Sequence, residues 1–189
     1  GFKSSLIKLN NDISEKKLLD EIKKLNDNPK LDGYIVQLPL PKHINEQTIL
    51  LAIDPKKDVD GFHPENFGRM ALQLNSYIPA TPFGIIQLLE RYKVPTSGKH
   101  CVVVGRSHIV GKPISILMSQ KRSAGNSTVT LAHSRTENLG AITRQADIII
   151  MALGIPEYLK ADMVKNGVTV IDVGTVSYTH LRAHETSRY

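Results

Sequence analysis

Residues 102–113 constrain the fold of this chain more than any other stretch. A β-branched run, Val102–Val104, ends at Gly105, and a second glycine follows six positions later at Gly111. The residues after Gly111 carry one apolar face with helical spacing. A strand, a glycine turn and a helix in this order place helix N–H groups, and the positive end of the helix dipole, where a bound phosphate can lie.

The two glycines of this stretch have different expected roles. Gly105 would permit the tight turn after the strand, and Gly111 would let the helix pack closely against the sheet or a cofactor. The pattern is G-x-S-x-x-x-G and not the usual G-x-G-x-x-G, so it is a weak motif when taken alone. An ordinary strand-to-helix turn that needs two glycines explains the stretch equally well.

Composition narrows the class of protein. A chain of 189 residues can form one large domain or two small ones. Its single cysteine, Cys101, excludes a disulfide framework and predicts a reducing, cytoplasmic location. Because Cys101 opens the valine-rich strand, we expect a small core residue and not a nucleophile. No apolar run approaches the roughly 18–20 residues that span a bilayer, so no membrane partner is expected.

The net charge of +6 raises the question of nucleic acid binding. The basic residues are dispersed among acidic neighbours, as Lys16, Lys17, Lys23 and Lys24 illustrate, and they form no dense block with interleaved aromatic residues. The pattern therefore predicts a mildly basic solvated surface and no nucleic acid partner. Attraction for small anionic molecules is a modest further expectation.

Hydrophobic periodicity predicts a small α/β domain over residues 1–78. The expected elements are a strand over Ser4–Leu9, a helix capped by Ser14, a strand over Gly33–Leu38 and a helix over Asn45–Ile53. This alternation indicates a parallel sheet with helical cover. Residues 54–64 are dense in charge and turn formers, which is typical of functional loops. Residues 65–78 have no clear pattern.

The second part of the chain, residues 79–175, is more regular. A helix is expected from Thr81 to about Tyr92, followed by strands over His100–Val104, Thr128–Ala132, Asp147–Met151 and Val168–Val173, with helices near 111–121, 136–145 and 160–166. Such an arrangement is half of a doubly wound, Rossmann-like dinucleotide-binding domain. Residues 176–189 suit neither a helix nor a strand, and we expect a non-native tail there.

Seven segments together resemble one enzyme family. They are Val36–Pro41, Lys57–Phe62, Pro79–Gly84, Gly105–Pro113, His133–Thr136, Ala146–Ile148 and Val170–Gly174. In order and spacing they resemble the bifunctional methylenetetrahydrofolate dehydrogenase/methenyltetrahydrofolate cyclohydrolases, up to about Thr175. The resemblance implies oxidation of 5,10-methylenetetrahydrofolate with NADP⁺ and hydrolysis of the product to 10-formyltetrahydrofolate, a reaction pair of one-carbon metabolism. It also implies a homodimer.

The resemblance assigns the substrate side to four residues. Gln37 would lie beside a catalytic lysine, and Asp60 would hold the pterin ring. Leu38 and Pro39 would also contact the substrate. The chemistry agrees, because a carboxylate accepts paired hydrogen bonds from amino and ring N–H groups, and an amide can orient an amine. Without the resemblance, a backbone-bonded polar residue at Gln37 and an Asx-turn at Asp60 would be the better explanations.

The expected NADP site uses the carboxyl ends of the strands. After the second strand stands Ala132-His133-Ser134-Arg135, without the acidic residue that NAD-binding folds place about 20 positions beyond the glycines. Arg106 and Ser134 would instead bind the 2′-phosphate. The expected cofactor-binding residues are Gly105, Arg106, Ser107, Ile109, Gly111, His133, Ser134 and Gly154, and no metal site is expected.

The sequence also departs from the family pattern. The Tyr-x-x-x-Lys segment that bears the catalytic lysine, and the P-G-G-V-G-P-M-T segment, do not occur in it. We therefore expect an internal fragment in which both domains are incomplete. Two alternatives stay open: another NADP-dependent dehydrogenase with a shikimate- or amino-acid-type substrate domain, and a non-catalytic nucleotide-binding module.

Overall fold

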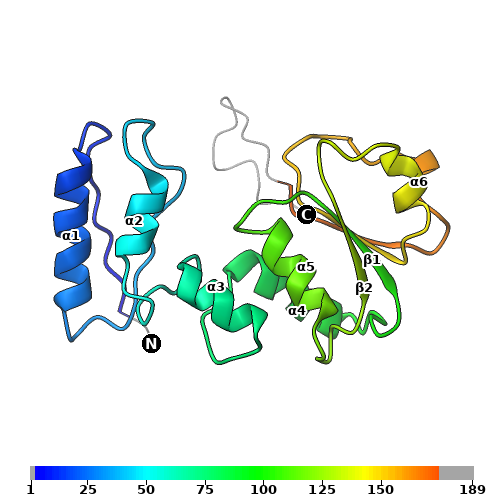
Figure 1. Ribbon diagram of the computed structural model, residues 1–189, viewed down its shortest axis with the longest axis horizontal. Coiled ribbons are helices and arrows are strands. Elements are labelled where there is room, and N and C mark those ends of the chain that lie inside the picture. The colour runs from blue at the N-terminus through cyan, green and yellow to red at the C-terminus, as the bar shows by residue number, and fades with distance from the viewer. Residues whose placement is uncertain (1–2, 175–189) are drawn as a thin grey trace. The chain divides into compact units, whose positions relative to one another are not determined.

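The structure, a computed structural model, describes residues 3–174. The chain divides into two units, the first ending at Ala80 and the second beginning at Thr81. The helices are α1 (Glu15–Asp27), α2 (Glu46–Ala52), α3 (Pro64–Ala71), α4 (Ala80–Arg91), α5 (Gly111–Ser119), α6 (Leu139–Thr143) and the 3₁₀ turn η1 (Ala161–Met163) (Figure 1). The strands are β1 (His100–Val104), β2 (Thr128–Ala132), β3 (Ile148–Met151) and β4 (Thr169–Asp172).

The core of the first unit lies between α1 and α2. Helix α1 begins where expected, because the Ser14 side chain accepts a hydrogen bond from the Lys17 N–H at 3.4 Å. Its buried residues Leu18 and Ile22 pack with Ile49 of α2. The two predicted helices of this unit are therefore confirmed.

The two strands predicted for the first unit are wrong. In the described part of this unit, the single β pairing outside named strands is an isolated parallel bridge between Tyr34 and Asp58. After Asp58 the chain turns, with the Gly61 N–H donating to the Asp58 carbonyl at 3.1 Å, so no ladder follows the bridge. Leu6 and Ile35, on the predicted strands, are 79% and 58% exposed. An apolar run forms a strand only where a neighbour supplies hydrogen bonds.

Helix α3 occupies part of the stretch that had no clear pattern. It starts at Pro64, directly after His63, whose ring nitrogen Nδ1 accepts from the Glu65 N–H at 3.1 Å. The residues that α3 buries are Asn66 and Met70. The helix is only eight residues long, shorter than the window over which a helical pattern is read, and one of the two residues that it buries is polar.

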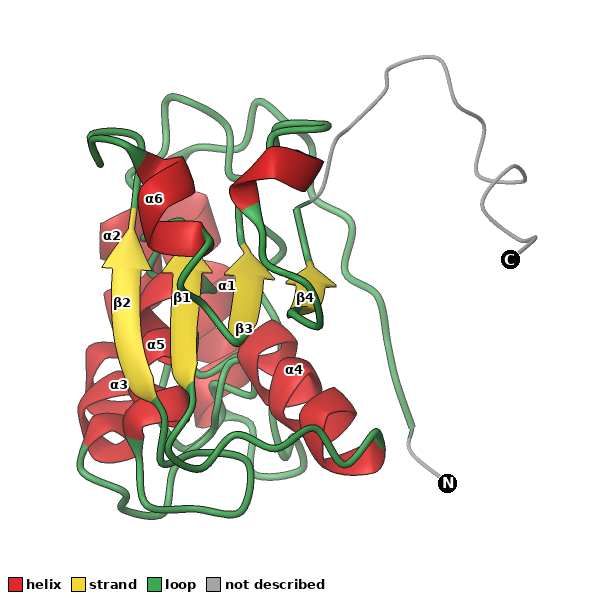
Figure 2. Ribbon diagram, turned by 90° about the vertical axis from the view of Figure 1, so that its right-hand side faces the viewer, coloured by secondary structure: helices red, strands yellow, loops and turns green. Residues whose placement is uncertain are grey.

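The second unit is built on a four-stranded parallel sheet in the order β2-β1-β3-β4 (Figure 2). Strands β1 and β2 have the predicted bounds, whereas β3 and β4 are shorter than predicted at their ends. All four residues of β3 are buried, as expected of a strand covered on both faces. The α/β fold class is therefore confirmed.

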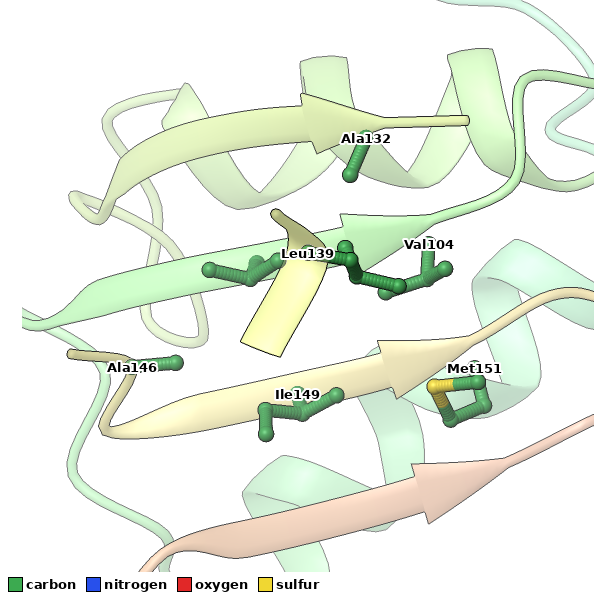
Figure 3. Close-up of a cluster of buried hydrophobic side chains, with 7 residues drawn as sticks. Val104, Ala132, Leu139, Ala146, Ile149 and Met151 are labelled. Carbon is green, nitrogen blue, oxygen red and sulfur yellow. The ribbon is translucent and has the colours of Figure 1, made fainter. Parts of the chain in front are cut away.

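Helices cover both faces of this sheet. The connection through α5 leads from β1 to β2, and the connection through α6 leads back past β1 to β3, so right-handed crossovers place α5 and α6 on opposite faces. Figures 2 and 3 show α6 on one side of the strands and α5 behind them. Helix α6 is shorter than predicted because Asn138, at φ 47°, interrupts the chain just before it. The last predicted helix is only the turn η1.

The core beneath α6 is drawn in Figure 3. Val104, Ala132, Ile149 and Met151 project from three neighbouring strands toward Leu139 of α6, together with Val102 and Ala146. Cys101, on β1, has no exposed surface, and burial raises the pKa of its thiol to about 12. The prediction that this cysteine is a core residue is confirmed. Among the described residues, no helix is both long and apolar enough to cross a membrane.

Asp147 joins three strands at the amino end of the sheet. Its carboxylate accepts from the His100 N–H at 2.9 Å and from the Lys165 ammonium at 2.7 Å. Its backbone N–H donates to the His100 carbonyl at 2.9 Å, and its carbonyl accepts from the Thr169 N–H at 3.0 Å. The hydrogen bond from Lys165, followed by the one from His100, lowers the pKa of Asp147 to about 2.

We predict that Asp147→Asn destabilises the second unit in a pH-dependent way. A carboxyl group whose pKa is lowered on folding stabilises the native state above its unfolded-state pKa, near 3.8, and loses that contribution as the pH falls toward about 2. Urea unfolding should show the largest difference between variant and parent near neutral pH, and a shrinking one between pH 4 and 2. Asp162→Asn, at an exposed position on η1, is the control. A difference that stays constant with pH would refute this role.

Candidate functional site

The carboxyl ends of the four strands form one edge of the sheet. After β1 the chain passes to the face covered by α5, and after the adjacent β3 it passes to the face covered by α6 and η1. Neighbouring strands whose connections leave to opposite faces form a crevice, where open α/β sheets bind their ligands. Residues 105–107 follow β1 and residues 152–154 follow β3 at this edge.

The close approach of two glycines shapes the turn after β1. Gly105 has a φ of +124°, and a Cβ on it would lie 2.4 Å from the Ala152 carbonyl oxygen. A Cβ on Gly111 would lie 1.9 Å from the Gly105 carbonyl oxygen, far inside van der Waals contact. Helix α5 therefore starts directly against the end of β1, and the steric roles expected for both glycines agree with this geometry.

Ser107 organises the start of α5. Its hydroxyl oxygen accepts from the N–H groups of Val110 and Gly111 at 3.1 and 3.3 Å, and its carbonyl accepts from the Lys112 N–H at 3.0 Å. The sequence alone had directed these helix N–H groups at a phosphate. In the structure, the Ser107 hydroxyl accepts from two of them, whereas Val110, at the N-cap position, makes no side-chain cap bond. Phosphate binding at this turn stays a prediction. In the described chain the hydroxyl of Ser107 thus orders the turn.

The loop after β2 lies beside the turn after β1, because the two strands are neighbours. It is a tight turn in which the His133 N–H donates to Thr136 Oγ1 at 2.8 Å and the Arg135 N–H donates to His133 Nδ1 at 3.1 Å. Ser134 and Arg135 are exposed, as is Arg106. Two arginine side chains and a serine hydroxyl thus lie at the edge of the sheet where NAD-binding domains place the carboxylate that binds the ribose 2′-OH.

The structure brings the expected cofactor-binding residues to this one edge of the sheet. They follow three adjacent strands: Gly105, Arg106, Ser107, Ile109 and Gly111 after β1, His133 and Ser134 after β2, and Gly154 after β3. Ile109 is 40% exposed, so an apolar side chain is available to a planar ring beside the turn. In the part of the chain that the structure describes, no group of three or more His, Cys, Asp and Glu residues could hold a metal ion.

Gln37, Leu38 and Pro39 lie in the first unit. The Gln37 side-chain amide donates to the Leu38 carbonyl at 2.9 Å, and the Leu38–Pro39 peptide bond is cis. Gln37 and Pro39 line a hollow of about 320 Å³ whose other walls are mainly apolar, whereas Leu38 and Asp60 do not line it. This hydrogen bond is the one expected if Gln37 is simply a polar residue bonded to the backbone. The Tyr34–Asp58 bridge joins the segment that bears Gln37 to the loop that bears Asp60.

Asp60 lies in the loop before α3 and is partly buried. Burial, and then the negative charge of Asp58, raise the pKa of the Asp60 carboxyl. A carboxylate that has lost part of its hydration, and that faces a like charge, gains more from external hydrogen-bond donors than one in free solution. Asp60 is therefore suited to accept N–H groups from a ligand.

Asp58 is a buried acidic residue that sequence reasoning missed. It is 2% exposed, and its Oδ2 accepts from the His63 N–H at 2.8 Å and from Asn66 Nδ2 at 3.0 Å. The same Asn66 amide donates to the Pro55 carbonyl at 2.9 Å. The sequence Asp58-Val59-Asp60 does not itself indicate which of the two aspartates is buried. The buried asparagine of α3 would have been the signal, had α3 been predicted.

Further contacts fix this loop from the other side. The Lys57 ammonium donates to the carbonyls at the end of α1, those of Leu25, Asn26 and Asn28, at 3.0, 2.7 and 2.7 Å. The Tyr34 N–H donates to the Lys57 carbonyl at 3.0 Å. Gly61 has a φ of +68° and leaves no room for a Cβ beside the Tyr77 carbonyl, 2.8 Å away. Asp60 is thus carried by a rigid loop.

We predict that Gly111→Ala destabilises the second unit by at least about 2 kcal/mol, because the methyl group meets backbone that cannot move without displacing β1 or α5. Gly84→Ala is the matched control. Gly84 lies inside α4 with open space around its Cβ position, so this change should stabilise by about 0.5–1 kcal/mol. Denaturant unfolding of both variants measures the effects, and a neutral Gly111→Ala would contradict the packing described.

The second unit thus has the doubly wound α/β architecture typical of dinucleotide-binding domains. Residues 79–186 match the family model of the tetrahydrofolate dehydrogenase/cyclohydrolase NAD(P)-binding domain, and residues 1–60 match that of the catalytic domain. The chain belongs to the tetrahydrofolate dehydrogenase/cyclohydrolase family.

Known proteins agree with this membership. The chain is 71% identical over 174 residues to the bifunctional protein FolD of Flavobacterium johnsoniae, covering 92% of this chain and 59% of the relative. A 5,10-methylenetetrahydrofolate dehydrogenase from the silkworm, Bombyx mori, superposes with a TM-score of 0.85 at 44% identity, covering 88% of this chain and 60% of that one. FolD of Trypanosoma brucei, complexed with NADP and an inhibitor, gives a TM-score of 0.82 at 34% identity, covering 88% and 56%. The chain thus spans about three fifths of its relatives' length.

Proposed function

We propose that this chain contributes the NADP site and part of the folate site of a bifunctional enzyme. The enzyme oxidises 5,10-methylenetetrahydrofolate and hydrolyses the methenyl product to 10-formyltetrahydrofolate. The observation that carries the proposal is the partly buried Asp60 carboxylate on its rigid loop, in a chain whose second unit has a dinucleotide crevice. The family membership and the FolD relatives support the pairing of these two features.

The residues at the strand ends fit NADP. The glycine turn lies where β1 ends beside β3, and a pyrophosphate would lie against it. Arg106, with Ser134 on the next loop, would bind the 2′-phosphate, because the planar guanidinium donates two parallel hydrogen bonds to phosphate oxygens. Ile109 and Gly154 would flank the rings. Ser107 would act indirectly, by holding the turn in shape.

Asp60 would orient the folate. Its two oxygens would accept hydrogen bonds from the amino group and a ring N–H of the pterin, a charge-assisted pair that fixes both position and plane. Gln37 would exchange its bond to the Leu38 carbonyl for the side chain of the lysine that the family resemblance implies, and Leu38 and Pro39 would contact the substrate.

The reaction then depends on orientation. When bound, NADP⁺ supplies the hydride acceptor for the methylene carbon of the folate. This chain's residues hold the two reactants in fixed positions, which lowers the entropic part of the barrier. In the hydrolytic step, Gln37 would position the lysine that assists the attack of water on the methenyl carbon.

We further infer a cytoplasmic homodimer. The free, fully buried thiol of Cys101 supports a reducing compartment, and the homodimer comes from the family resemblance. Light scattering coupled to size exclusion tests the oligomeric state. Steep loss of affinity for DNA with rising salt would instead favour a nucleic acid function.

We predict that Arg106→Gln weakens NADP⁺ binding roughly 10- to 100-fold and leaves NAD⁺ binding nearly unchanged, because a charge-assisted bond to the 2′-phosphate is lost. Calorimetric titration of the 189-residue chain with each nucleotide measures the ratio. Arg91→Gln, at the end of α4, is the control. Equal losses for both nucleotides would place Arg106 elsewhere than at the 2′-phosphate.

We predict that Asp60→Asn lowers folate turnover at least about 100-fold without changing the affinity for NADP⁺, since the lost hydrogen bonds belong to the pterin. Turnover is measured in a chimaera in which the 174 matching residues of this chain replace those of the Flavobacterium johnsoniae FolD. The chimaera with Asp32→Asn, an exposed change in the same unit, is the control. Normal turnover of the Asp60 variant would contradict the proposal that Asp60 binds the pterin.

A further inference from the structure

The buried pair of Asp58 and Asn66 lies directly behind the proposed folate contact. Asn66 is 4% exposed, and its amide nitrogen uses both N–H groups, one on the Pro55 carbonyl and one on Asp58 Oδ2. Asp58 Oδ2 also accepts from the His63 N–H. The pair therefore ties the start of the loop, its middle and the beginning of α3 into one network.

This network determines where Asp60 lies. Between Asp58 and His63 the chain makes a turn, closed by the hydrogen bond from the Gly61 N–H to the Asp58 carbonyl. Asp60 lies inside that turn, so its backbone can move only if the Asp58 contacts break. Among the described residues Asp58 forms no ion pair, and it is 2% exposed, so its negative charge acts on its surroundings through a poorly screened medium.

Other ionisable groups surround the loop, and the structure gives each a place. The Lys57 ammonium is held by the α1 carbonyls, and His63 accepts from the Glu65 N–H. Tyr77 belongs to the segment packed against Gly61. Among the described charged groups, Asp58 is the one that adds to burial in raising the pKa of Asp60. The same charge contributes to raising the pKa of Tyr34 on the facing segment, after burial and Asp54.

We propose that Asp58, held by Asn66, is a positioning residue for folate binding: it fixes the loop that presents Asp60 and keeps a buried negative charge near it. The proposal rests on the proposed function of Asp60. The ligand N–H groups replace the water that burial removed, so a bound pterin gains more from Asp60 than from a fully hydrated carboxylate. Folate affinity should therefore fall as the pH drops through the raised pKa of Asp60.

Two substitutions separate charge from geometry. Asp58→Asn has the same shape and keeps an oxygen for His63 and Asn66, but it removes the charge, so the pKa of Asp60 should fall toward its ordinary value. Asn66→Ala keeps the charge but releases the loop, so binding should weaken roughly 10- to 100-fold at neutral pH. Asp32→Asn, at an exposed site of the same unit, is the control for both.

The experiment combines two readouts on the 189-residue chain. Carbon-13 NMR of the aspartate carboxyl groups follows the titration of Asp60 without any ligand, and calorimetry follows the affinity for folic acid between pH 3 and 8. In Asp58→Asn both the Asp60 titration and the acid limb of folic acid binding should move to lower pH together.

The results separate failure of the inference about Asp58 from failure of the proposed function of Asp60. An Asp60 titration and a binding limb that both stay unmoved in Asp58→Asn overturn the inference, as does unchanged binding in Asn66→Ala. If the Asp60 titration moves but Asp60→Asn binds folic acid normally, the coupling stands and the proposed function fails. The two failures are therefore distinguishable.

Discussion

The contact between Gly111 and the Gly105 carbonyl is the constraint on which the second unit depends. It holds the first turn of α5 against the end of β1 at a distance that no side chain permits. Helix α5 is thereby committed to one face of the sheet, and the connection through α6 to the other, which opens the crevice between β1 and β3. The edge of the sheet at which we propose that NADP binds thus depends on the contact between Gly111 and the Gly105 carbonyl.

The two units are stabilised in different ways. The second relies on apolar burial: the residues of β3 are inaccessible on both faces of a regular ladder. The first has few regular backbone pairings outside its helices, and side chains bind backbone groups instead. Lys57 binds the end of α1, Asn26 donates to the Ala52 carbonyl, and Asn66 binds the Pro55 carbonyl. Its loops are therefore ordered by polar contacts that truncation of single side chains would remove.

This difference explains what the sequence could predict. The sequence predicts β1 with its observed bounds because a strand covered on both faces is a continuous β-branched run. It also predicts the bounds of β2, a partly exposed edge strand, because Thr128, Val129 and Thr130 are β-branched residues that favour strands. The runs at 4–9 and 33–38 are equally apolar, but strand formation also requires a paired neighbour, which local pattern does not report. The roles of Asp58 and the hydrogen bonds of Ser107 could not be predicted for a related reason: their partners, Asn66 and the N–H groups at the start of α5, become evident only once the helices are placed.

The thiol of Cys101 has a use that its chemistry alone would not suggest. It lies on the central part of the sheet with no exposed surface, and its pKa of about 12 keeps it in the unreactive thiol form. An alkylating reagent can modify it only after β1 separates from its neighbours. Because the chain has one cysteine, the labelling rate reports how often the sheet opens, and a ligand bound at the strand ends should slow that opening. The labelling rate of Cys101 therefore measures the opening of the second unit without any added probe.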